Sequence, residues 1–388
     1  MGLITAIGDS VAVNRDALKE GRCGIGNDMH LFPSRYSGVL PFGEVPMTTD
    51  ELCKRLGIDP AGVTRTSILA LHAFEQAIAD SGLSRETLIS TDTALISAST
   101  VGGMCLTDEL FADAQAADKG SEYLGMYDSA SVNFFIQERH PVEGIVNIIN
   151  TACSSSANAI MYGARLIKQG LAKRAIVGGV DCMAKFTVNG FNALHILSDR
   201  QCTPFDEGRK GLNLGEGAAY LVLEREEDCA GKKVYARLSG YANTNDAFHP
   251  SSLSDEGDGP FLSMQEALSS AGLEPGQISF INAHGTGTEN NDLVESRAML
   301  RLFGTVPPFA STKSNTGHTL GAAGAVEAIY SILNIVHQEL YPHLHFSQPI
   351  AETGLKPLTE GRAAVVDHVM SNSFGFGGNC SSLIFSKA

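Results

Sequence analysis

The expected architecture of this chain starts from one stretch, Asn150-Thr151-Ala152-Cys153-Ser154-Ser155-Ser156-Ala157. It follows an apolar run at 144–149 and precedes a helical pattern at 158–168, which predicts a strand, a sharp turn and a helix. The thiol of Cys153 lies at the turn, where unpaired backbone N–H groups and the helix dipole favour the thiolate. The alternative is a small buried residue packed under a helix. The small neighbouring residues leave room for a substrate, so we expect a nucleophile.

Strand and helix patterns alternate on both sides of this stretch, which predicts a mostly parallel sheet flanked by helices. The expected strands are 3–7, 93–99, 174–180, 218–224, 234–241, 278–283, 365–369 and 382–385. The expected helices are 13–20, 49–56, 64–81, 106–117, 129–137, 261–271, 291–303 and 320–337. A charged run at 224–228 predicts a seam between two halves, 1–228 and 229–388, although a solvated surface loop would have the same composition. No exact sequence repeat relates the two halves.

The composition limits the class of protein. With 388 residues, 43% of them hydrophobic, 41 glycines and 7% aromatic residues, the chain suits a large α/β core. A net charge of −15 without a basic run argues against nucleic-acid and anionic-membrane binding. Eight cysteines without a regular spacing indicate reduced thiols. Neither a signal sequence nor an apolar run of about 20 residues is evident, so we expect a soluble cytoplasmic protein.

Three later stretches offer partners for a nucleophilic cysteine, which needs a donor or base and a site for a developing oxyanion. Residues 282–288 place His284 among glycines at the end of a predicted strand, where α/β sheets bind ligands. Residues 313–324 hold Lys313 and His318 in a loop before an Ala-rich helix. Residues 372–379 surround two phenylalanines with glycines whose N–H groups can face a ligand.

Each of these motifs also has a plain structural interpretation. His284 could be a structural histidine, Lys313 a surface lysine and His318 a helix-entry residue, while the last stretch could be a bulged sheet edge. The glycine spacing at 317–324 has neither the dinucleotide nor the P-loop pattern, so we reject nucleotide binding. His343 and His345 lack a third ligand, so we expect them at the surface and expect no metal.

The order of one cysteine, two glycine-flanked histidines and a lysine is more specific than any single motif. The chain resembles a β-ketoacyl-acyl carrier protein synthase of the discrete, elongating type, in the thiolase-like superfamily. The resemblance extends over nearly the whole chain, through Thr-Ala-Cys-Ser-Ser-Ser at 151–156, Pro-Phe-Asp at 204–206, Gly-Glu-Gly-Ala at 215–218, Ala-His-Gly-Thr-Gly-Thr at 283–288, Lys-Ser-Asn-Thr-Gly-His at 313–318 and Asn-Ser-Phe-Gly-Phe-Gly-Gly at 372–378.

The resemblance implies a thiolase fold, with two similar α/β halves in a five-layered αβαβα core, and a dimer. It implies that Cys153 accepts an acyl chain from an acyl carrier protein, and that malonyl carrier protein then loses carbon dioxide and attacks the thioester. His284 and His318 would stabilise the enolate, while backbone N–H groups of Cys153 and Phe376 would form the oxyanion hole. Phe374 and Phe376 would form a gate, and Lys313 would hold His318. The residues that would support this site are Glu327, Thr286, Thr288 and Asn379. No cofactor is implied.

The chain departs from the family pattern in places that concern substrate size. Leu212 stands where the family has phenylalanine, Asn379-Cys380 replaces Thr-Asn, and the first strand is short. Candidates for the end of the pocket, at the dimer interface, are Met104, Leu106 and Thr107. Candidates for docking the acidic carrier protein are Lys54, Arg55, Arg65, Arg209 and Lys210. Two other functions are a non-catalytic chain-length partner, which would lack the cysteine, and a thioester hydrolase. The polyketide, polyene and fatty acid pathways, and a homodimer or a heterodimer with a cysteine-less partner, stay open.

Overall fold

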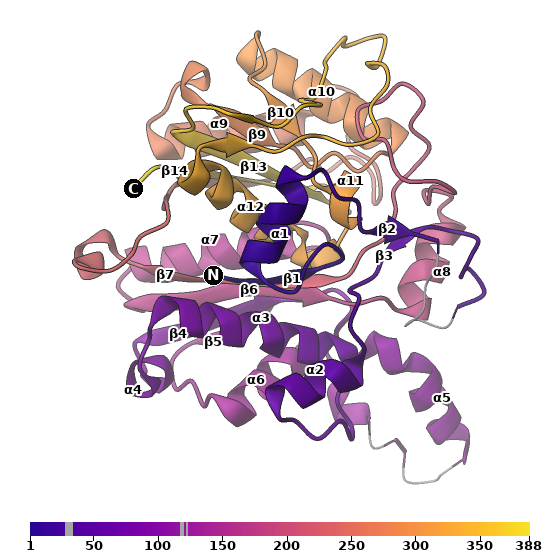
Figure 1. Cartoon of the computed structure of the whole chain (residues 1–388), viewed down its shortest axis with the longest axis vertical. Helices are drawn as coiled ribbons and strands as arrows, with labels where there is room; N and C mark the ends of the chain where they lie inside the picture. The colour runs from indigo at the N-terminus through magenta and orange to yellow at the C-terminus, as the bar shows by residue number, and fades with distance from the viewer. Residues whose placement is uncertain (28–33, 117–119, 122) are drawn as a thin grey trace.

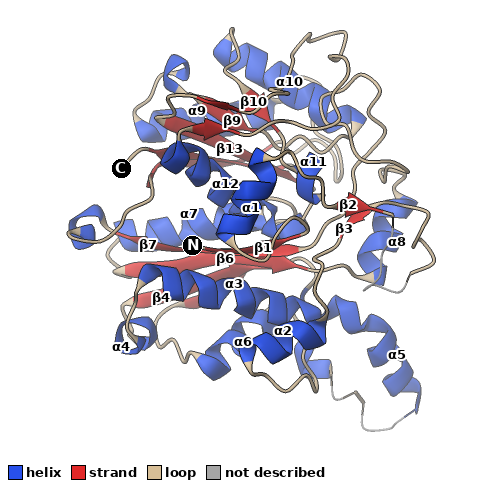
Figure 2. Cartoon of the chain, viewed as in Figure 1, coloured by secondary structure: helices blue, strands red, loops and turns tan. Residues whose placement is uncertain are grey.

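The computed structural model describes residues 1–27, 34–116, 120–121 and 123–388. Two five-stranded sheets form its framework (Figures 1 and 2). In spatial order the first sheet contains β1 (Gly2–Thr5), β7 (Gly217–Glu224), β6 (Arg174–Asp181), β4 (Thr93–Ala98) and β5 (Val146–Ile149). The second contains β10 (Phe309–Ala310), β9 (Phe280–Asn282), β13 (His368–Gly375), β14 (Asn379–Ser386) and β8 (Arg237–Asn245). Two small ladders pair β2 (Ile25–Gly26) with β3 (Phe42–Gly43) and β11 (Glu339–Leu340) with β12 (Arg362–Ala363).

The two sheets have the same topology. If the strands of each sheet are numbered in chain order, both run third, second, fourth, fifth, first. In both, the third, second and fourth strands pair in parallel, and the fourth, fifth and first pair antiparallel. The two halves therefore repeat in structure although they do not repeat in sequence. The expectation of a mostly parallel sheet is wrong, because β7 pairs antiparallel with both of its neighbours in the first sheet, and β14 does the same in the second.

Helices cover both sheets and separate them. The central layer contains α7 (Ser155–Lys168) and α12 (Ala323–His337), which pack on each other and on strands of both sheets (Figure 1). The outer face of the first sheet is covered by α3 (Arg65–Ser81), with α2 (Thr49–Leu56) and α6 (Ser131–Arg139) beyond it. The outer face of the second is covered by α9 (Asp258–Ala271), with α10 (Glu289–Phe303) beside it. The order helix, sheet, helix, sheet, helix is the five-layered thiolase fold.

The remaining helices lie at the edges and in the connections. They are α1 (Val11–Lys19), α4 (Arg85–Ile89), α5 (Thr107–Ala116), α8 (Lys185–Ala193), α11 (Lys313–Thr316), and the 3₁₀ turns η1 (Gly102–Leu106), η2 (Leu124–Met126), η3 (Glu226–Cys229), η4 (Pro275–Gln277) and η5 (Leu320–Ala322). The sequence patterns did not predict α4, α8 or α11. The stretch 372–379 is mostly strand, because β13 continues to Gly375 and β14 begins at Asn379. The predicted helix end at Ala117 lies outside the described residues.

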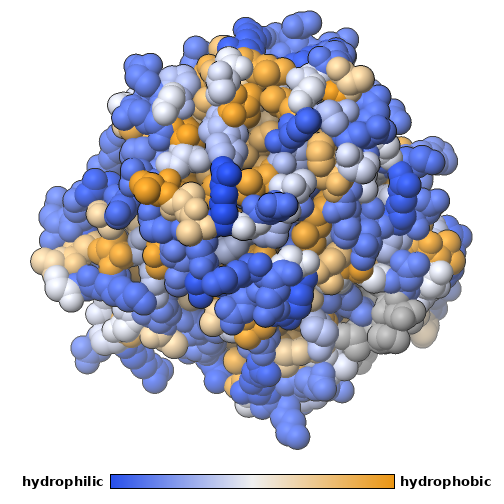
Figure 3. Space-filling model, turned by 45° about the horizontal axis from the view of Figure 1, so that its top comes forward, coloured by the Kyte–Doolittle hydropathy of each residue, from blue (hydrophilic) through white to orange (hydrophobic). Residues whose placement is uncertain are grey.

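The central helix is more apolar than the sequence pattern suggested. In the part of the chain that the structure describes, the segment Leu320–His337 is long and apolar enough to cross a membrane by length and composition. However, 89% of it is buried between the two sheets, as in the core helix of a soluble protein. On the face drawn in Figure 3, hydrophilic residues cover most of the surface and apolar residues form separate groups between them.

Candidate active site

The turn at Cys153 is held by its own hydroxyl groups. Ser155, the first residue of α7, accepts from the backbone N–H of Thr151 at 2.8 Å and donates to the carbonyl of Ala152 at 2.5 Å. Ala152 has a φ of 52°, a left-handed conformation that is strained for a residue with a Cβ atom. Gly375, at the end of β13, packs so closely that a Cβ atom there would lie 2.6 Å from the Thr151 carbonyl oxygen. Gly375, in the second half of the chain, therefore helps to fix the Cys153 turn, which belongs to the first half.

The thiol of Cys153 is only 6% exposed, and burial raises its pKa to about 11. The charge of Lys313 and a hydrogen bond from the backbone N–H of Phe376 lower the pKa but do not offset the burial. A helix dipole contributes about 0.3–1 kcal/mol, which is less than one pKa unit. The expectation that the dipole makes Cys153 a thiolate is therefore wrong in its net direction, because burial of the sulfur disfavours the charged form and raises the pKa.

The pH dependence of alkylation tests this result. We expect the rate of Cys153 alkylation by iodoacetamide to rise about tenfold per pH unit between about pH 7 and 9, because thiolate is a small fraction of the thiol below its pKa. The rate is measured by mass spectrometry of the peptide 140–165, which separates Cys153 from the other cysteines. A plateau of this rate near neutral pH would show that the thiolate already predominates and would contradict the expectation.

His284 follows β9 and lies at the carboxyl end of the second sheet. A buried carboxylate, Glu295 of α10, accepts from the backbone N–H of His284 at 2.9 Å and of Gly285 at 2.8 Å. Asp292, one turn earlier on α10, accepts from the N–H groups of Thr286 and Gly287. The loop 284–287 is thus tied to one helix by two carboxylates, which restricts the position of the His284 imidazole.

Lys313 is 2% exposed and contacts His284. Its ammonium group donates to the His284 carbonyl at 2.6 Å, lies 3.3 Å from His284 Nδ1, and forms an ion pair with Glu327 of α12. The implied role of Lys313 in holding His318 is therefore corrected, because its hydrogen bonds reach the other histidine. Burial raises the pKa of Glu327 to about 7, and the lysine charge opposes this rise.

The hydrogen bonds of the two imidazoles assign their tautomers. The backbone N–H of Leu320 donates to His318 Nδ1 at 3.2 Å, so the proton of neutral His318 is on Nε2. This Nε2 is buried and has no hydrogen-bond partner among the described residues. A cation faces His284 Nδ1, which likewise places the His284 proton on Nε2. Both rings therefore offer an N–H group.

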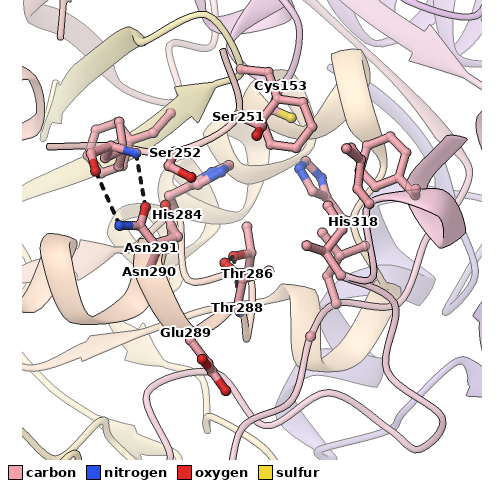
Figure 4. Close-up of a pocket in the computed structure, with 18 of the residues that line it drawn as sticks. Cys153, Ser251, Ser252, His284, Thr286, Thr288, Glu289, Asn290, Asn291 and His318 are labelled. Carbon is pink, nitrogen blue, oxygen red and sulfur yellow. Dashed lines mark hydrogen bonds between the residues drawn. The ribbon is translucent and has the colours of Figure 1, made fainter. Parts of the chain in front are cut away.

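Both imidazoles are neutral. Burial lowers the pKa of each well below its usual range, and the charge of Lys313 lowers both further. Their ring centroids are 5.5 Å apart and the planes cross at 83°. Figure 4 shows the two rings and the Cys153 sulfur around one space, with Thr286, Thr288 and Glu289 further from the thiol. Two neutral N–H donors near a thiol can stabilise a negatively charged oxygen.

These groups line a cavity of about 400 Å³. Its polar side includes Thr286 and Thr288, whose hydroxyls are 2.9 Å apart, together with Ser251, Ser252 and Asn290. Its lining also includes Lys210 and Leu212. Leu212 is the residue at the position where the family pattern has phenylalanine. The cavity is large enough for a flexible chain and has amide-compatible donors and acceptors along one side.

The aromatic residues of the predicted gate lie beside the thiol. Phe374 contacts the His284 ring, with centroids 5.6 Å apart, and Phe376 stacks on Phe191 at 5.7 Å with an interplanar angle of 18°. Asn379 Oδ1 accepts hydrogen bonds from Ser154 at 2.7 Å and from Asn158 at 2.9 Å, which join the gate to α7. Sequence reasoning missed Phe191, because it lies on the unpredicted helix α8.

Several other expectations do not survive. Arg65 forms an ion pair with the fully buried Glu216, and Arg209 is buried with its donors on backbone carbonyls, so neither can dock a partner. The exposed docking candidates are Lys54, Arg55 and Lys210.

His343 is 2% exposed and both of its ring nitrogens are bonded to backbone groups, so the expectation of a surface residue is wrong. Among the described residues no group of three or more possible metal ligands occurs.

Comparisons with known proteins agree with this geometry. Residues 1–229 match the family described as "Beta-ketoacyl synthase, N-terminal domain", and residues 235–347 match "Beta-ketoacyl synthase, C-terminal domain". The chain is 32% identical to 3-oxoacyl-[acyl-carrier-protein] synthase 2 of Vibrio harveyi, over 100% of this chain and 97% of that protein.

Two solved structures are similar over 100% of this chain. One is the ishigamide ketosynthase/chain length factor, with a TM-score of 0.91, 28% identity and 97% of that chain covered. The other is a ketosynthase in complex with its chain length factor from Xenorhabdus doucetiae, with a TM-score of 0.83, 32% identity and 96% of that chain covered.

Proposed function

The chain belongs to the β-ketoacyl synthase family, and we propose that it condenses an acyl group held on Cys153 with a malonyl group held on an acyl carrier protein. The product is a β-ketoacyl carrier protein, and the reaction is an acyl transfer. One observation supports this chemistry above the others. The two buried imidazoles beside the thiol are neutral and both present an N–H group, so they can hold an enolate oxygen.

The proposed reaction begins with exchange of a thioester. The Cys153 sulfur attacks the acyl carbonyl, the carrier thiol leaves, and the proton of Cys153 passes to that leaving thiol. The backbone N–H groups of Cys153 and Phe376 hold the oxyanion of the tetrahedral intermediate. The backbone N–H of Phe376 interacts favourably with the sulfur, since it lowers the pKa of Cys153.

The second substrate then uses the histidines. The carbon–carboxylate bond of the malonyl group breaks and releases carbon dioxide, and its electron pair forms an enolate whose oxygen accepts from His284 and His318. The enolate carbon attacks the Cys153 thioester, and collapse of the intermediate releases the cysteine. Lys313 donates to His284 Nδ1 and so keeps the proton on Nε2, while Glu327 balances the buried cation. Thr286 and Thr288 would contact the carrier arm along the cavity.

The same tautomers weigh against a thioester hydrolase. A hydrolase of the Cys–His type needs an imidazole nitrogen that takes the thiol proton. Here Nδ1 of His318 accepts from backbone and Nδ1 of His284 faces an ammonium group, so neither ring has a free basic nitrogen toward Cys153. A non-catalytic chain-length partner is disfavoured because the thiol and both histidines are present around one cavity.

Product analysis tests the function. Purified protein, acyl carrier thioester and malonyl carrier protein are incubated together, and the products are identified by mass spectrometry of the carrier protein. We expect a β-ketoacyl carrier protein, together with carbon dioxide in equal amount. Free acid without condensation product would show hydrolysis instead. An active preparation that never forms an acyl adduct on the peptide 140–165 would exclude Cys153 as the acyl carrier.

The proposal also covers the division of the chain into two halves and the partners with which it assembles. We propose a boundary near residues 228 and 229, which is supported by the use of separate strands in the two sheets. We also propose a homodimer or a heterodimer with a cysteine-less chain-length partner, because the similar solved structures are named as ketosynthases with chain length factors. A cytoplasmic location suits a partner of soluble carrier proteins.

A further inference from the structure

A second pair of thiols lies outside the site described above. Cys105 is in η1, and Cys182 directly follows β6, so the two are 77 residues apart in the chain. Both sulfurs contact the hydroxyl of Thr66 on α3, at 3.9 Å from Cys105 and 3.0 Å from Cys182. The Thr66 hydroxyl donates its hydrogen to the Gly102 carbonyl at 2.7 Å, so it can only accept from the thiols. The two thiols therefore meet at the same hydroxyl group.

The surroundings of the pair hold it in place. Asp181, the residue before Cys182, accepts from the backbone N–H groups of Thr100 and Val101 at the entrance to η1. It also accepts from the N–H of Gly321, so the first turn after His318 is tied to the same carboxylate. The strand end that bears one thiol and the turn that bears the other are therefore fixed relative to each other.

The two sulfurs differ in the way that sequential oxidation requires. Cys105 is partly exposed, whereas Cys182 is fully buried behind it. The interaction with Cys182 lowers the pKa of Cys105, while that same interaction, followed by burial, raises the pKa of Cys182. Cys153, in contrast, is nearly buried and has a raised pKa. An oxidant therefore meets a more reactive thiolate at Cys105 than at the candidate nucleophile.

We propose that Cys105 and Cys182 form an oxidisable dithiol, a modification site for hydroperoxides that is separate from the condensing chemistry. The Cys105 thiolate attacks a peroxide oxygen, the O–O bond breaks, and Cys105 becomes a sulfenic acid as hydroxide leaves. The Cys182 sulfur then attacks the sulfenic sulfur, the S–O bond breaks, and a disulfide forms. The hydroxide from the first step and the hydroxyl from the second each combine with one thiol proton and leave as two waters, so two thiols lose two electrons and hydrogen peroxide gains them.

The site also lies close to the gate. Cys182 is followed by Met183 and Ala184, which lead into α8, and α8 bears the Phe191 ring that stacks on Phe376. A disulfide would join the start of this segment to η1. The proposal does not depend on the proposed function, because the disulfide is detected without substrate.

The test uses the intact protein and hydrogen peroxide. After oxidation, free thiols are blocked and the protein is digested with trypsin without reduction. Trypsin separates the three cysteines into peptides 86–119 (Cys105), 140–165 (Cys153) and 175–185 (Cys182). We expect a linked pair of 86–119 and 175–185 that disappears on treatment with dithiothreitol, while 140–165 keeps its free thiol.

Three variants make the result specific. The linked pair should be absent from Cys105→Ser and Cys182→Ser, and should persist in Cys229→Ser, whose thiol is partly exposed in a surface 3₁₀ turn. The proposal is overturned if wild type gives no linked pair, if 140–165 is oxidised first, or if Cys105 is found only as a sulfinic acid. It is equally overturned if Cys105 forms its main disulfide with a different cysteine.

Discussion

Replacing Cys153 by alanine should abolish both the acyl adduct and the condensation product. Cys153 is the only cysteine among the described residues that line the cavity with both histidines, and the Ser and Thr hydroxyls in that lining are weak nucleophiles without an activating base. We expect the condensation rate to fall by at least about 10⁴-fold, on the scale of a lost catalytic nucleophile. Mass spectrometry of the carrier protein measures the product, and mass spectrometry of the intact enzyme measures the adduct.

Cys229→Ala is the matched control, because Cys229 lies in η3 and is not among the residues that line the cavity. It should keep wild-type rates of acylation and condensation. If Cys153→Ala formed an acyl-enzyme on another residue, the proposed acyl carrier would be wrong. Decarboxylation of malonyl carrier protein without condensation is expected to continue in Cys153→Ala, since the histidines that stabilise the enolate remain.

Replacing His318 by alanine should separate the two half-reactions. The Nε2–H of His318 is buried and unpartnered, so it is available to the enolate oxygen. The loss of one such donor typically costs about 10²–10³ in rate, or about 2.7–4 kcal/mol of transition-state stabilisation. We expect this loss in decarboxylation and condensation, while acylation of Cys153 stays within a few-fold of wild type. Release of labelled carbon dioxide measures the first quantity and the intact-protein mass measures the second.

His337→Ala provides the control for His318→Ala, because His337 is an exposed residue at the end of α12. It should leave both half-reactions unchanged. Equal losses of acylation and decarboxylation in His318→Ala would mean that the imidazole acts on the thiol, and the assignment of the histidine to the second substrate would fail. A normal acylation rate also shows that the variant is folded.

Local chemistry accounts for most of what could be predicted. The helix at 49–56 was placed at its observed bounds, and Gly57 ends it in the left-handed conformation, although the cap expected at Thr49 and Asp50 is formed by Thr48 in a capping box with Glu51. The strand, turn and helix around Cys153 were predicted for the same reason, since turn residues and apolar runs lie next to each other in the chain. The short segment α11 was missed, because its four residues are held by contacts to other elements rather than by propensity.

Non-local contacts account for what could not be predicted. The role given to Lys313 was assigned to the wrong histidine, since sequence order does not say which ring lies next to an ammonium group. Phe191 was missed because its importance comes from stacking on Phe376, which is 185 residues away. Arg65 and Arg209 were expected at the surface because arginines usually are, and only the fold shows that their partners are buried.

The amino-acid sequence by itself determined which groups we propose for the chemistry, namely one thiol, two imidazoles, a lysine and the glycines that let the backbone approach them. Those choices are visible in local motifs, because a turn before a helix and a strand before a glycine have short-range causes. Only the tertiary structure decided the state of these groups. Burial keeps the Cys153 thiol protonated and both imidazoles neutral, and distant hydrogen bonds set the tautomers. Desolvation and long-range contacts depend on how the two halves pack, which no single stretch of sequence encodes.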